Sequence, residues 1–315
     1  MLCGIPGSGK STYAKELSQT ENAIILSSDQ LRLELFGDVN HQENNGELFQ
    51  ELYRRAKQFL NQGNNVIIDA TNISQKRRIH FINEFKKFKK ECIYLSTPYL
   101  NCVIRDYERD KKVGVQVIHR MYKQMQIPFK EEGWDEVKYV KSKINNDSCV
   151  KNIMENIITR HINYNSLFKH LNFFSCFRRI FELPHDSSYH SFSVSRHTYY
   201  VWEYILNHYN EKDKLVMLWT ALLHDTGKAD SKTFKEGSRY ASFIGHENIS
   251  SQLAFELLYD LGYELDFILQ IVKLVQLHMR LLNGGENAEE KIKNMYGEDV
   301  LNKLKFFKEA DTQAK

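Results

Sequence analysis

A glycine-rich segment near the amino terminus constrains the fold of this chain more than any other feature. Residues 4–12 read GIPGSGKST, which fits the phosphate-binding pattern G-x-x-x-x-G-K-S/T. Its glycines allow the backbone to curl so that successive N–H groups point at nucleotide phosphates, while Lys10 adds a cation and the Ser11 hydroxyl a Mg²⁺ ligand. Apolar residues precede the segment and a helical pattern follows it, a context that a chance glycine loop lacks. The predicted nucleotide-binding residues are Gly4, Gly7, Ser8, Gly9, Lys10, Ser11 and Thr12.

Two kinds of pattern divide the chain. Up to about residue 145, short apolar runs at residues 23–26, 66–68 and 92–95 alternate with longer helical patterns, which predicts an α/β domain with a parallel sheet and helices on both faces. Beyond a polar stretch at residues 141–147, the chain shows helical patterns with few strand signals, which predicts an all-α domain. We expect a first domain over residues 1–145, a linker or irregular helical segment over 146–184, and a second domain over 185–315.

The composition agrees with two folded domains and excludes several other classes. The 315 residues are 42% apolar and 26% charged, and no apolar run is long enough to span a bilayer. The five cysteines show no paired or metal-ligand spacing, so we expect reduced thiols in a cytoplasmic protein without a signal peptide or a membrane partner. The net charge of +3 does not identify a nucleic-acid binder, although residues 105–123 are locally basic.

Polar side chains follow two of the predicted strands. Asp29 and Arg32 lie three residues apart, so they share a face if a helix begins there. Asp29 can accept the proton of an attacking hydroxyl and Arg32 can bind a neighbouring phosphate, although helix capping is an alternative role for Asp29. Asp69 ends a predicted strand, where a carboxylate can hold the water shell of Mg²⁺.

The basic segment of residues 105–123 resembles the lid helices of phage-type polynucleotide 5′-kinases. The glycine-rich loop and the two strand-end segments occur in the order found in that family, and the resemblance extends to about residue 140. It implies a P-loop kinase that uses ATP with Mg²⁺, with Asp29 as the general base. It also implies that Arg32 holds the 3′ phosphate beside the attacking 5′-hydroxyl and that Arg109 clamps the phosphates of ATP.

The second domain contains four histidines and two aspartates in the order H…HD…H…H…D. Imidazole and carboxylate ligands together suit Mn, Fe, Co, Ni or Zn rather than Ca or Mg alone. Two such metals bridged by a carboxylate would activate water and stabilise the leaving oxygen of a phosphoester, and Lys228 would add a cation for the phosphate. Each histidine alone is more often an ordinary core or surface residue, so the prediction depends on the set. The set is His197, His224, Asp225, His246, His278 and Asp311.

This order resembles the HD phosphohydrolase superfamily, and residues 222–247 resemble the HD domain of bacterial CCA-adding enzymes, which acts on 2′,3′-cyclic phosphates and related phosphoesters. The resemblance implies an all-α HD domain with Mn²⁺, Co²⁺, Ni²⁺ or a similar metal. It implies one metal held by His197, His224, Asp225 and Asp311. It implies a second metal held by Asp225, His246 and His278.

The two predicted activities suggest repair of broken nucleic-acid ends. A 5′-kinase and a phosphohydrolase for 2′,3′-cyclic, 2′ or 3′ phosphates would prepare both ends for ligation, with RNA favoured over DNA and a ligase as a possible partner. One alternative is a kinase of a nucleotide or other small metabolite fused to an HD nucleotidase. Another is an HD fold that only binds RNA or regulates. The predicted catalytic residues are Lys10, Asp29, Arg32, Arg109, Asp225 and Lys228.

The ends of the chain carry one further expectation. Only three residues precede Gly4, whereas a strand of about 5–6 residues normally leads into such a loop. Four residues follow Asp311, where a helix would normally continue. This predicts a chain that is clipped or has a mis-assigned start, and an extended chain that melts at a higher temperature.

Overall fold

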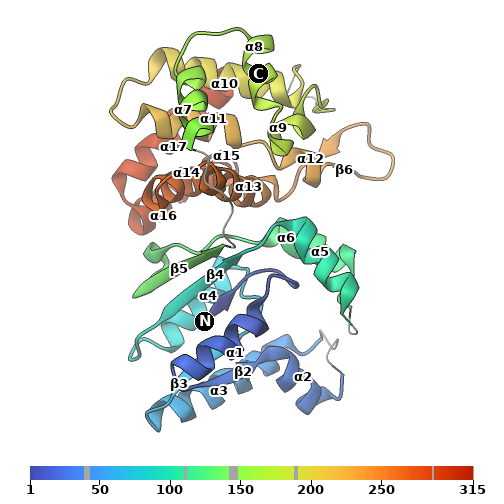
Figure 1. The fold of residues 1–315 in the computed structure, drawn as a ribbon, viewed down its shortest axis with the longest axis vertical. Helices are drawn as coiled ribbons and strands as arrows, with labels where there is room; N and C mark the ends of the chain where they lie inside the picture. Colours follow the sequence, from blue (N-terminus) through green and yellow to red (C-terminus); the bar gives the residue numbers. More distant parts are fainter. Residues whose placement is uncertain (39–42, 110–111, 142–147, 188–190, 286, 315) are drawn as a thin grey trace. The chain divides into compact units, whose positions relative to one another are not determined.

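The computed structural model describes residues 1–38, 43–109, 112–141, 148–187, 191–285 and 287–314. The chain divides into two compact units, Met1–Ser142 and Lys143–Lys315 (Figure 1). The predicted polar linker at residues 141–147 falls almost entirely outside the described residues. No helix in the described ranges has the length and apolar character needed to cross a membrane.

Parallel strands form the centre of the first unit, in one hydrogen-bonded group of three and one of two. These strands are β1 (Leu2–Cys3), β2 (Ala23–Ser27), β3 (Asn65–Asp69), β4 (Glu91–Ser96) and β5 (Glu136–Lys141). Strand β4 pairs with β1 on one side and with β5 on the other, and β2 pairs with β3, all in parallel. Parallel neighbours need crossover connections, which the intervening helices supply. The parallel sheet predicted from the sequence is confirmed.

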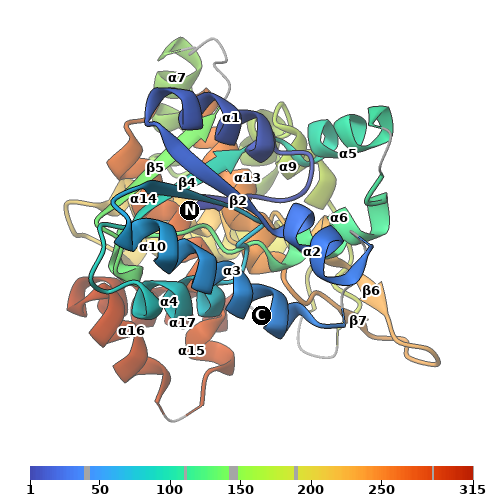
Figure 2. The same cartoon turned by 90° about the horizontal axis from the view of Figure 1, so that it is seen from below.

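Helices cover the sheet from two sides. They are α1 (Lys10–Thr20), α2 (Ser28–Phe36), α3 (Asn45–Asn61), α4 (Gln75–Glu84), α5 (Tyr99–Glu108) and α6 (Val115–Gln124), followed by a 3-10 turn η1 (Lys130–Glu132). Figure 2 shows α1 on one side of the sheet and α3 and α4 on the other. On the α1 side, Ala14 packs in a buried apolar cluster with Leu2, Ile67 and Ile93.

The carboxyl ends of β1, β2 and β3 position the predicted kinase residues. The glycine-rich loop follows β1, α2 follows β2, and β3 ends at Asp69, which lies opposite Ser27 in the parallel register. The Gly4 N–H donates to the Thr71 carbonyl at 3.0 Å and so joins the glycine-rich loop to the loop after β3. Ligands of open parallel sheets bind at this edge.

A buried ion pair holds the loop after β3 in place. Arg78 and Glu132 are both fully buried, and Arg78 Nη2 lies 2.6 Å from Glu132 Oε1. Arg78 Nη1 also donates to the carbonyls of Asn72 and Ile73, at 3.0 and 3.1 Å. The Asn72 side chain in turn donates to the Leu2 carbonyl at 2.7 Å. The loop is therefore fixed to β1 by polar contacts that are buried away from water.

The described residues of the second unit are helical apart from one small hairpin and an isolated bridge between Pro184 and Ser193. Its helices are α7 (Ser148–Ile158), α8 (Tyr164–Leu171), α9 (Ser175–Ile180), α10 (Val194–His208), α11 (Lys214–Leu223), α12 (Lys228–Ser231), α13 (His246–Asp260), α14 (Leu265–Leu277), α15 (Arg280–Asn283), α16 (Ala288–Tyr296) and α17 (Glu298–Gln313). The hairpin pairs β6 (Thr233–Phe234) with β7 (Ala241–Ser242) in antiparallel fashion. Helix α11 is apolar on nearly every side and is buried along most of its length, which places it in the core of this unit.

The segment of residues 146–184, expected to be a linker or an irregular helical segment, is helical in its described part. It contains α7, α8 and α9, and these belong to the same compact unit as the rest of the second domain. Trp202 Nε1 donates to the Ile158 carbonyl at 3.0 Å, and the Tyr199 hydroxyl donates to the Ile162 carbonyl at 3.0 Å. The fully buried side chain of Phe168 adds apolar packing. The segment is therefore part of the core that supports α10.

Candidate active sites

The glycine-rich loop has the shape of a phosphate cradle. Gly7 and Gly9 have φ angles of 82° and 95°, which side-chain-bearing residues rarely adopt, and a Cβ at Gly7 would overlap the backbone of Cys102. Gly9 is the N-cap of α1, so the positive end of this helix faces the loop. The Ser8 hydroxyl is buried at the loop and has no hydrogen-bond partner within the described ranges. An anion with oxygen acceptors fits this cradle.

Lys10 and Asp69 supply the charges beside the cradle. Lys10 is buried, and its Nζ donates to the Ile5 carbonyl at 2.9 Å. Burial lowers the pKa of Lys10, whereas the carboxylate of Asp69 opposes that shift. Ser11 lies in the first turn of α1, next to Lys10. The hydroxyl of Ser11 and the carboxylate of Asp69 offer oxygen ligands that suit Mg²⁺. The ammonium of Lys10 offers a positive charge to the nucleotide phosphates.

The structure brings Asp29 and Arg32 together on α2, as their spacing predicts. Arg32 Nη1 lies 2.9 Å from Asp29 Oδ1, and Arg32 Nη2 donates to Asn45 Oδ1 at 3.2 Å. The Asp29 side chain is 76% exposed, whereas that of Arg32 is only 7% exposed. Ser27, not Asp29, is the N-cap of α2, because its hydroxyl accepts from the Gln30 N–H. The capping alternative for Asp29 is therefore wrong, and its carboxylate remains accessible to a hydroxyl.

The lid helices bring a different arginine to the cradle from the one predicted. Arg105 on α5 donates from Nη1 to the Gly7 carbonyl at 3.3 Å. Arg109 instead pairs with Asp106, whose carboxylate also accepts from the N–H groups of Val113 and Gly114 at 3.0 and 2.9 Å. Arg109 thus helps to fix the connection between α5 and α6. Its predicted contact with ATP phosphates stays a prediction.

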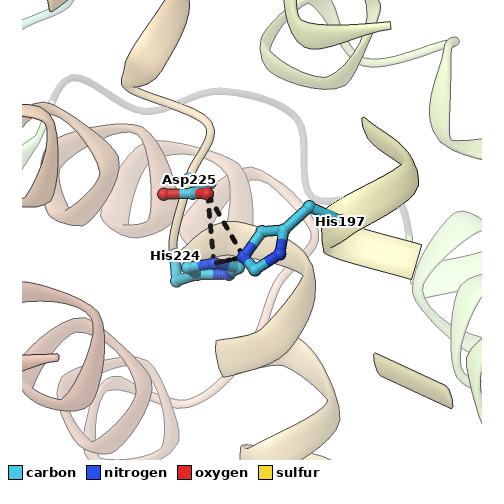
Figure 3. A group of neighbouring side chains, drawn as sticks. All are labelled: His197, His224 and Asp225. Atoms are coloured by element: carbon cyan, nitrogen blue, oxygen red, sulfur yellow. Dashed lines mark hydrogen bonds and ion pairs between the residues drawn. The ribbon is translucent and has the colours of Figure 1, made fainter. Parts of the chain in front are cut away.

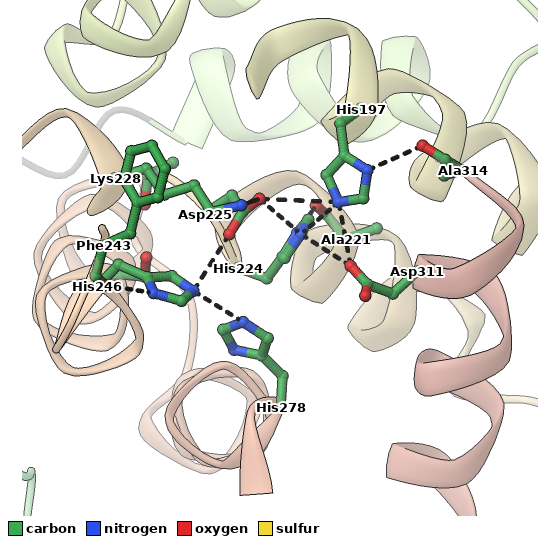
Figure 4. A network of polar contacts seen from close by, with 12 residues as sticks. His197, Ala221, His224, Asp225, Lys228, Phe243, His246, His278, Asp311 and Ala314 are labelled. Atoms are coloured by element: carbon green, nitrogen blue, oxygen red, sulfur yellow. Dashed lines mark hydrogen bonds and ion pairs between the residues drawn. The ribbon is translucent and has the colours of Figure 1, made fainter. Parts of the chain in front are cut away.

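The six predicted ligands of the second unit come from five helical segments and converge in its interior. His197 lies on α10, His224 and Asp225 follow α11, His246 begins α13, His278 follows α14, and Asp311 lies on α17. Each is between 1% and 8% exposed. Two groups have ligand atoms within 4.8 Å of one another. These are His197, His224 and Asp225 (Figure 3), and Asp225, His246 and His278 (Figure 4).

Asp225 joins the two groups through its two oxygens. Its Oδ2 lies 3.2 Å from His224 Nε2 and 3.7 Å from His197 Nε2, while its Oδ1 lies 3.3 Å from His246 Nε2. Burial raises the pKa of this carboxyl, but His224 and Lys228 outweigh it and hold the pKa well below its usual range. An ionised carboxylate in this position can bridge two metals.

Asp311 lies beside the first group. Its Oδ1 is 3.0 Å from His197 Nε2 and 3.7 Å from His224 Nε2. Burial raises the pKa of Asp311, but the neighbouring His197 and His224 outweigh burial and lower the pKa below its usual value, so this carboxyl is also ionised. Asp311 is not part of either close group, so its role as a metal ligand stays a prediction.

Hydrogen bonds to backbone carbonyls fix the tautomer of all four imidazoles. The Nδ1 atoms lie 2.7–2.9 Å from carbonyl oxygens, which can only accept, so each Nδ1 carries the proton and each Nε2 an exposed lone pair. The pairs are His197 with Ala314, His224 with Ala221, His246 with Phe243, and His278 with Val275. This is the arrangement that orients metal-binding imidazoles.

The Nε2 lone pairs of the four imidazoles lie close together, with few hydrogen-bond donors between them. The Nε2 atoms of His197 and His224 are 3.4 Å apart, and those of His246 and His278 are 3.2 Å apart. Two neutral Nε2 atoms cannot hydrogen-bond to each other, so these contacts are unfavourable without a cation between them. The imidazole and carboxylate donors fit divalent transition metals better than Mg²⁺.

Lys228 and His185 extend the second site. Lys228 Nζ lies 2.7 Å from Asp225 Oδ2 and 2.9 Å from His185 Nε2. His185 Nδ1 lies 2.8 Å from the Phe192 carbonyl, so its Nε2 is the acceptor for Lys228. Gly227 permits this geometry, because a Cβ there would overlap the carbonyl of His246. Sequence reasoning predicted Lys228 but missed His185, which lies in no local motif.

Metal-free protein is expected to lose stability on acidification. Burial, with repulsion from His246 and His224, lowers the pKa of His278 to about 3, whereas an unfolded histidine titrates near 6.5. Between these values the unfolded state binds a proton that the folded state does not, so the free energy of unfolding falls as the pH decreases, by up to about 1.4 kcal/mol per pH unit. Urea unfolding of chelator-treated protein at pH 7 and pH 5 measures this loss. His278→Gln should reduce this loss of unfolding free energy. An unchanged pH dependence in that variant would contradict the assignment of the loss to His278.

Comparison with known proteins agrees with this division of the chain. A family model described as an AAA domain matches residues 1–130, and one described as an HD domain matches residues 188–313. An L-seryl-tRNA(Sec) kinase of Methanococcus maripaludis is 30% identical over 151 residues, which are 43% of this chain and 55% of that protein. The chain thus spans about half the length of this curated relative. The chain joins a P-loop kinase-like domain to a C-terminal HD domain.

Proposed function

We propose that this protein heals broken RNA ends. Its kinase domain phosphorylates 5′-hydroxyl ends with ATP, and its HD domain removes 2′,3′-cyclic, 2′ or 3′ phosphates. The observation that carries the proposal is the Asp29–Arg32 pair at the carboxyl edge of the sheet. It offers an exposed carboxylate for a hydroxyl and, 2.9 Å away, a buried guanidinium for a phosphate next to that hydroxyl. The 5′ end of a nucleic-acid strand presents these two groups together.

The kinase step follows from the positions of three side chains. The N–H groups of the cradle and Lys10 bind the ATP phosphates and offset the charge that develops during transfer. Arg32 positions the acceptor through its phosphate, so that the 5′-hydroxyl is held beside Asp29. Asp29 accepts the hydroxyl proton as the oxygen attacks the γ-phosphorus, and ADP leaves.

The hydrolase step depends on the two groups that share Asp225. A pair of divalent metals, when bound there, would supply an activated water and stabilise the leaving oxygen of a phosphoester. The chain itself keeps each Nε2 lone pair directed inward through the backbone carbonyls that hold Nδ1. Lys228 offers a cation to the phosphate, and His185 holds its Nζ in position.

RNA is favoured as the substrate for two reasons. A 2′,3′-cyclic phosphate requires a 2′-hydroxyl, which DNA lacks. The kinase relative from Methanococcus maripaludis is named for an acceptor attached to a transfer RNA, which supports an acceptor hydroxyl that is carried on RNA. A kinase of free nucleotides or other small metabolites, fused to an HD nucleotidase, remains the alternative.

One incubation tests both halves of the proposal. An RNA with a 5′-hydroxyl and a 2′,3′-cyclic phosphate is supplied with γ-labelled ATP, Mg²⁺ and Mn²⁺, and both ends are then analysed. We expect label at the 5′ end and a free hydroxyl pair at the 3′ end, with loss of the 3′ reaction when Mg²⁺ is the sole metal. A DNA strand and a free nucleoside serve as controls. Label transfer to the nucleoside but not to the RNA would replace this proposal by the small-metabolite alternative.

A further inference from the structure

A second guanidinium lies near the Arg32 side chain. Arg77 on α4 is half-buried, and its guanidinium carbon lies 4.3 Å from the centroid of the Phe49 ring on α3. Within the described residues, no ion pair involves Arg77. A cation held over an aromatic face and without a carboxylate partner is available to bind an anion.

One face of α3 supports both guanidinium groups. Asn45 accepts from Arg32 Nη2 at 3.2 Å, and Phe49, four residues later, lies beneath Arg77. Residues four apart lie on the same face of a helix, about 6 Å apart along its axis. The ring of Tyr53, another four residues on, packs edge-on against Phe49 with centroids 6.0 Å apart. Two residues one turn apart on α3 therefore contact the two guanidinium groups, Asn45 that of Arg32 and Phe49 that of Arg77.

Electrostatics agrees with two neighbouring cations at this surface. Burial lowers the pKa of Arg77, and repulsion from the positive charge of Arg32 lowers this pKa further. Tyr53 has the opposite effect and raises the pKa. Asp29 pairs with Arg32 and is largely exposed, and no carboxylate pairs with Arg77 in the described part of the chain. Of these three charged groups, Arg32 is paired with Asp29 and Arg77 is paired with no carboxylate in the described residues.

We propose that Arg32 and Arg77 bind two successive phosphates of the acceptor strand, so that the kinase prefers an oligonucleotide to a mononucleotide. The proposal rests on the 5′-kinase function argued above and adds a second phosphate subsite to it. Arg32 binds the phosphate nearest the 5′-hydroxyl, and Arg77 binds the next one. A fork of N–H donors suits a phosphate oxygen pair, and stacking on Phe49 fixes the plane of the guanidinium.

Three defined acceptors with a 5′-hydroxyl test the second subsite. Adenosine carries no phosphate, adenosine 3′-monophosphate carries one, and the dinucleotide ApAp carries two. Mg²⁺ is the sole metal in these assays, so that the HD domain does not remove the 3′ phosphates. For the unmodified protein we expect a KM at least about tenfold lower for ApAp than for adenosine 3′-monophosphate, the effect of one charge-assisted contact. Arg77→Met keeps an unbranched side chain but removes the guanidinium that lies over Phe49, and it should abolish this preference. The KM values for adenosine 3′-monophosphate and ATP should stay unchanged.

Lys76 provides the matched control, because it is exposed and adjacent to Arg77 on α4. Lys76→Met should keep the preference for ApAp. The second subsite is refuted if the unmodified protein uses both nucleotides equally well, or if Arg77→Met weakens both by the same factor. In either case the 5′-kinase proposal would stand. If the unmodified protein phosphorylates none of the three acceptors and no longer RNA, both proposals fail.

Discussion

Asp225→Ala is expected to abolish phosphoester hydrolysis and to leave 5′ phosphorylation intact. Asp225 is the residue common to both ligand groups, with Oδ2 3.2 Å from His224 Nε2 and Oδ1 3.3 Å from His246 Nε2. Its loss would remove the carboxylate shared by the two proposed metal sites, and it leaves the buried Lys228 without its carboxylate. The decrease in hydrolysis activity should exceed the roughly 10–100-fold decrease that is typical when a residue that only supports a metal ligand is removed. Elemental analysis of the purified variant, together with both activity assays, measures the outcome.

Lys10→Ala is the reciprocal change. It removes the cation beside the ATP phosphates but touches none of the imidazoles, so phosphorylation should be lost and hydrolysis retained. The two residues belong to different compact units, and effects at independent sites usually add, so the double variant should lose both activities and nothing more. A folded single variant that lost both activities would instead show one composite centre, and the division of labour proposed here would be wrong.

Strands of the first unit were predictable from the sequence where they contain a continuous run of apolar residues. The runs at residues 23–26, 66–68 and 92–95 lie inside β2, β3 and β4. Strand β5 was not predicted, because three of the six residues of EVKYVK are charged and the strand is mostly exposed or half-buried. It pairs with β4 alone among the described strands, so only tertiary pairing identifies it as a strand.

Residues 146–184 show a different limit of sequence reasoning. Helices α8 and α9 have eight and six residues, about two turns each, which is too short for a clear helical period. Their aromatic side chains gain a meaning only through contacts with α10, such as the ring of Tyr164 against that of Tyr199. The sequence shows the composition of this segment but not the core that it joins.

The candidate sites were predictable in their residue types and order, but not in their hydrogen bonding. The six predicted ligands were chosen from the order of histidines and aspartates in the chain, and five of them lie in the two close groups of the structure. The carbonyl contacts that fix each tautomer, and the contact between Lys228 and His185, depend on segments far apart in sequence. The same holds for Arg105, which reaches the Gly7 carbonyl from α5, whereas Arg109 lies just beyond the end of that helix.

Asp29→Asn is expected to slow the kinase step by roughly 10²–10⁴-fold, the usual contribution of a general base. The amide keeps the size of the side chain but cannot take up the hydroxyl proton. ATP affinity should be unchanged, because the cradle and Lys10 are intact. The melting temperature should also be nearly unchanged, because Ser27 caps α2 and an ion pair with so exposed a carboxylate contributes little, about 0.5 kcal/mol or less.

Three measurements on Asp29→Asn separate catalysis from structure: single-turnover phosphorylation of a 5′-hydroxyl RNA, ATP binding by titration, and thermal unfolding. Ser28→Ala on the same helix turn is a suitable control, since it changes the neighbouring side chain and leaves the carboxylate and the N-cap in place. A base assignment requires that the rate falls while ATP affinity and melting temperature stay constant. If ATP affinity fell in step with the rate, Asp29 would organise the nucleotide site instead. The proton acceptor would then have to be sought elsewhere, and buried Asp69, at the end of the neighbouring strand, would be the first carboxylate to replace.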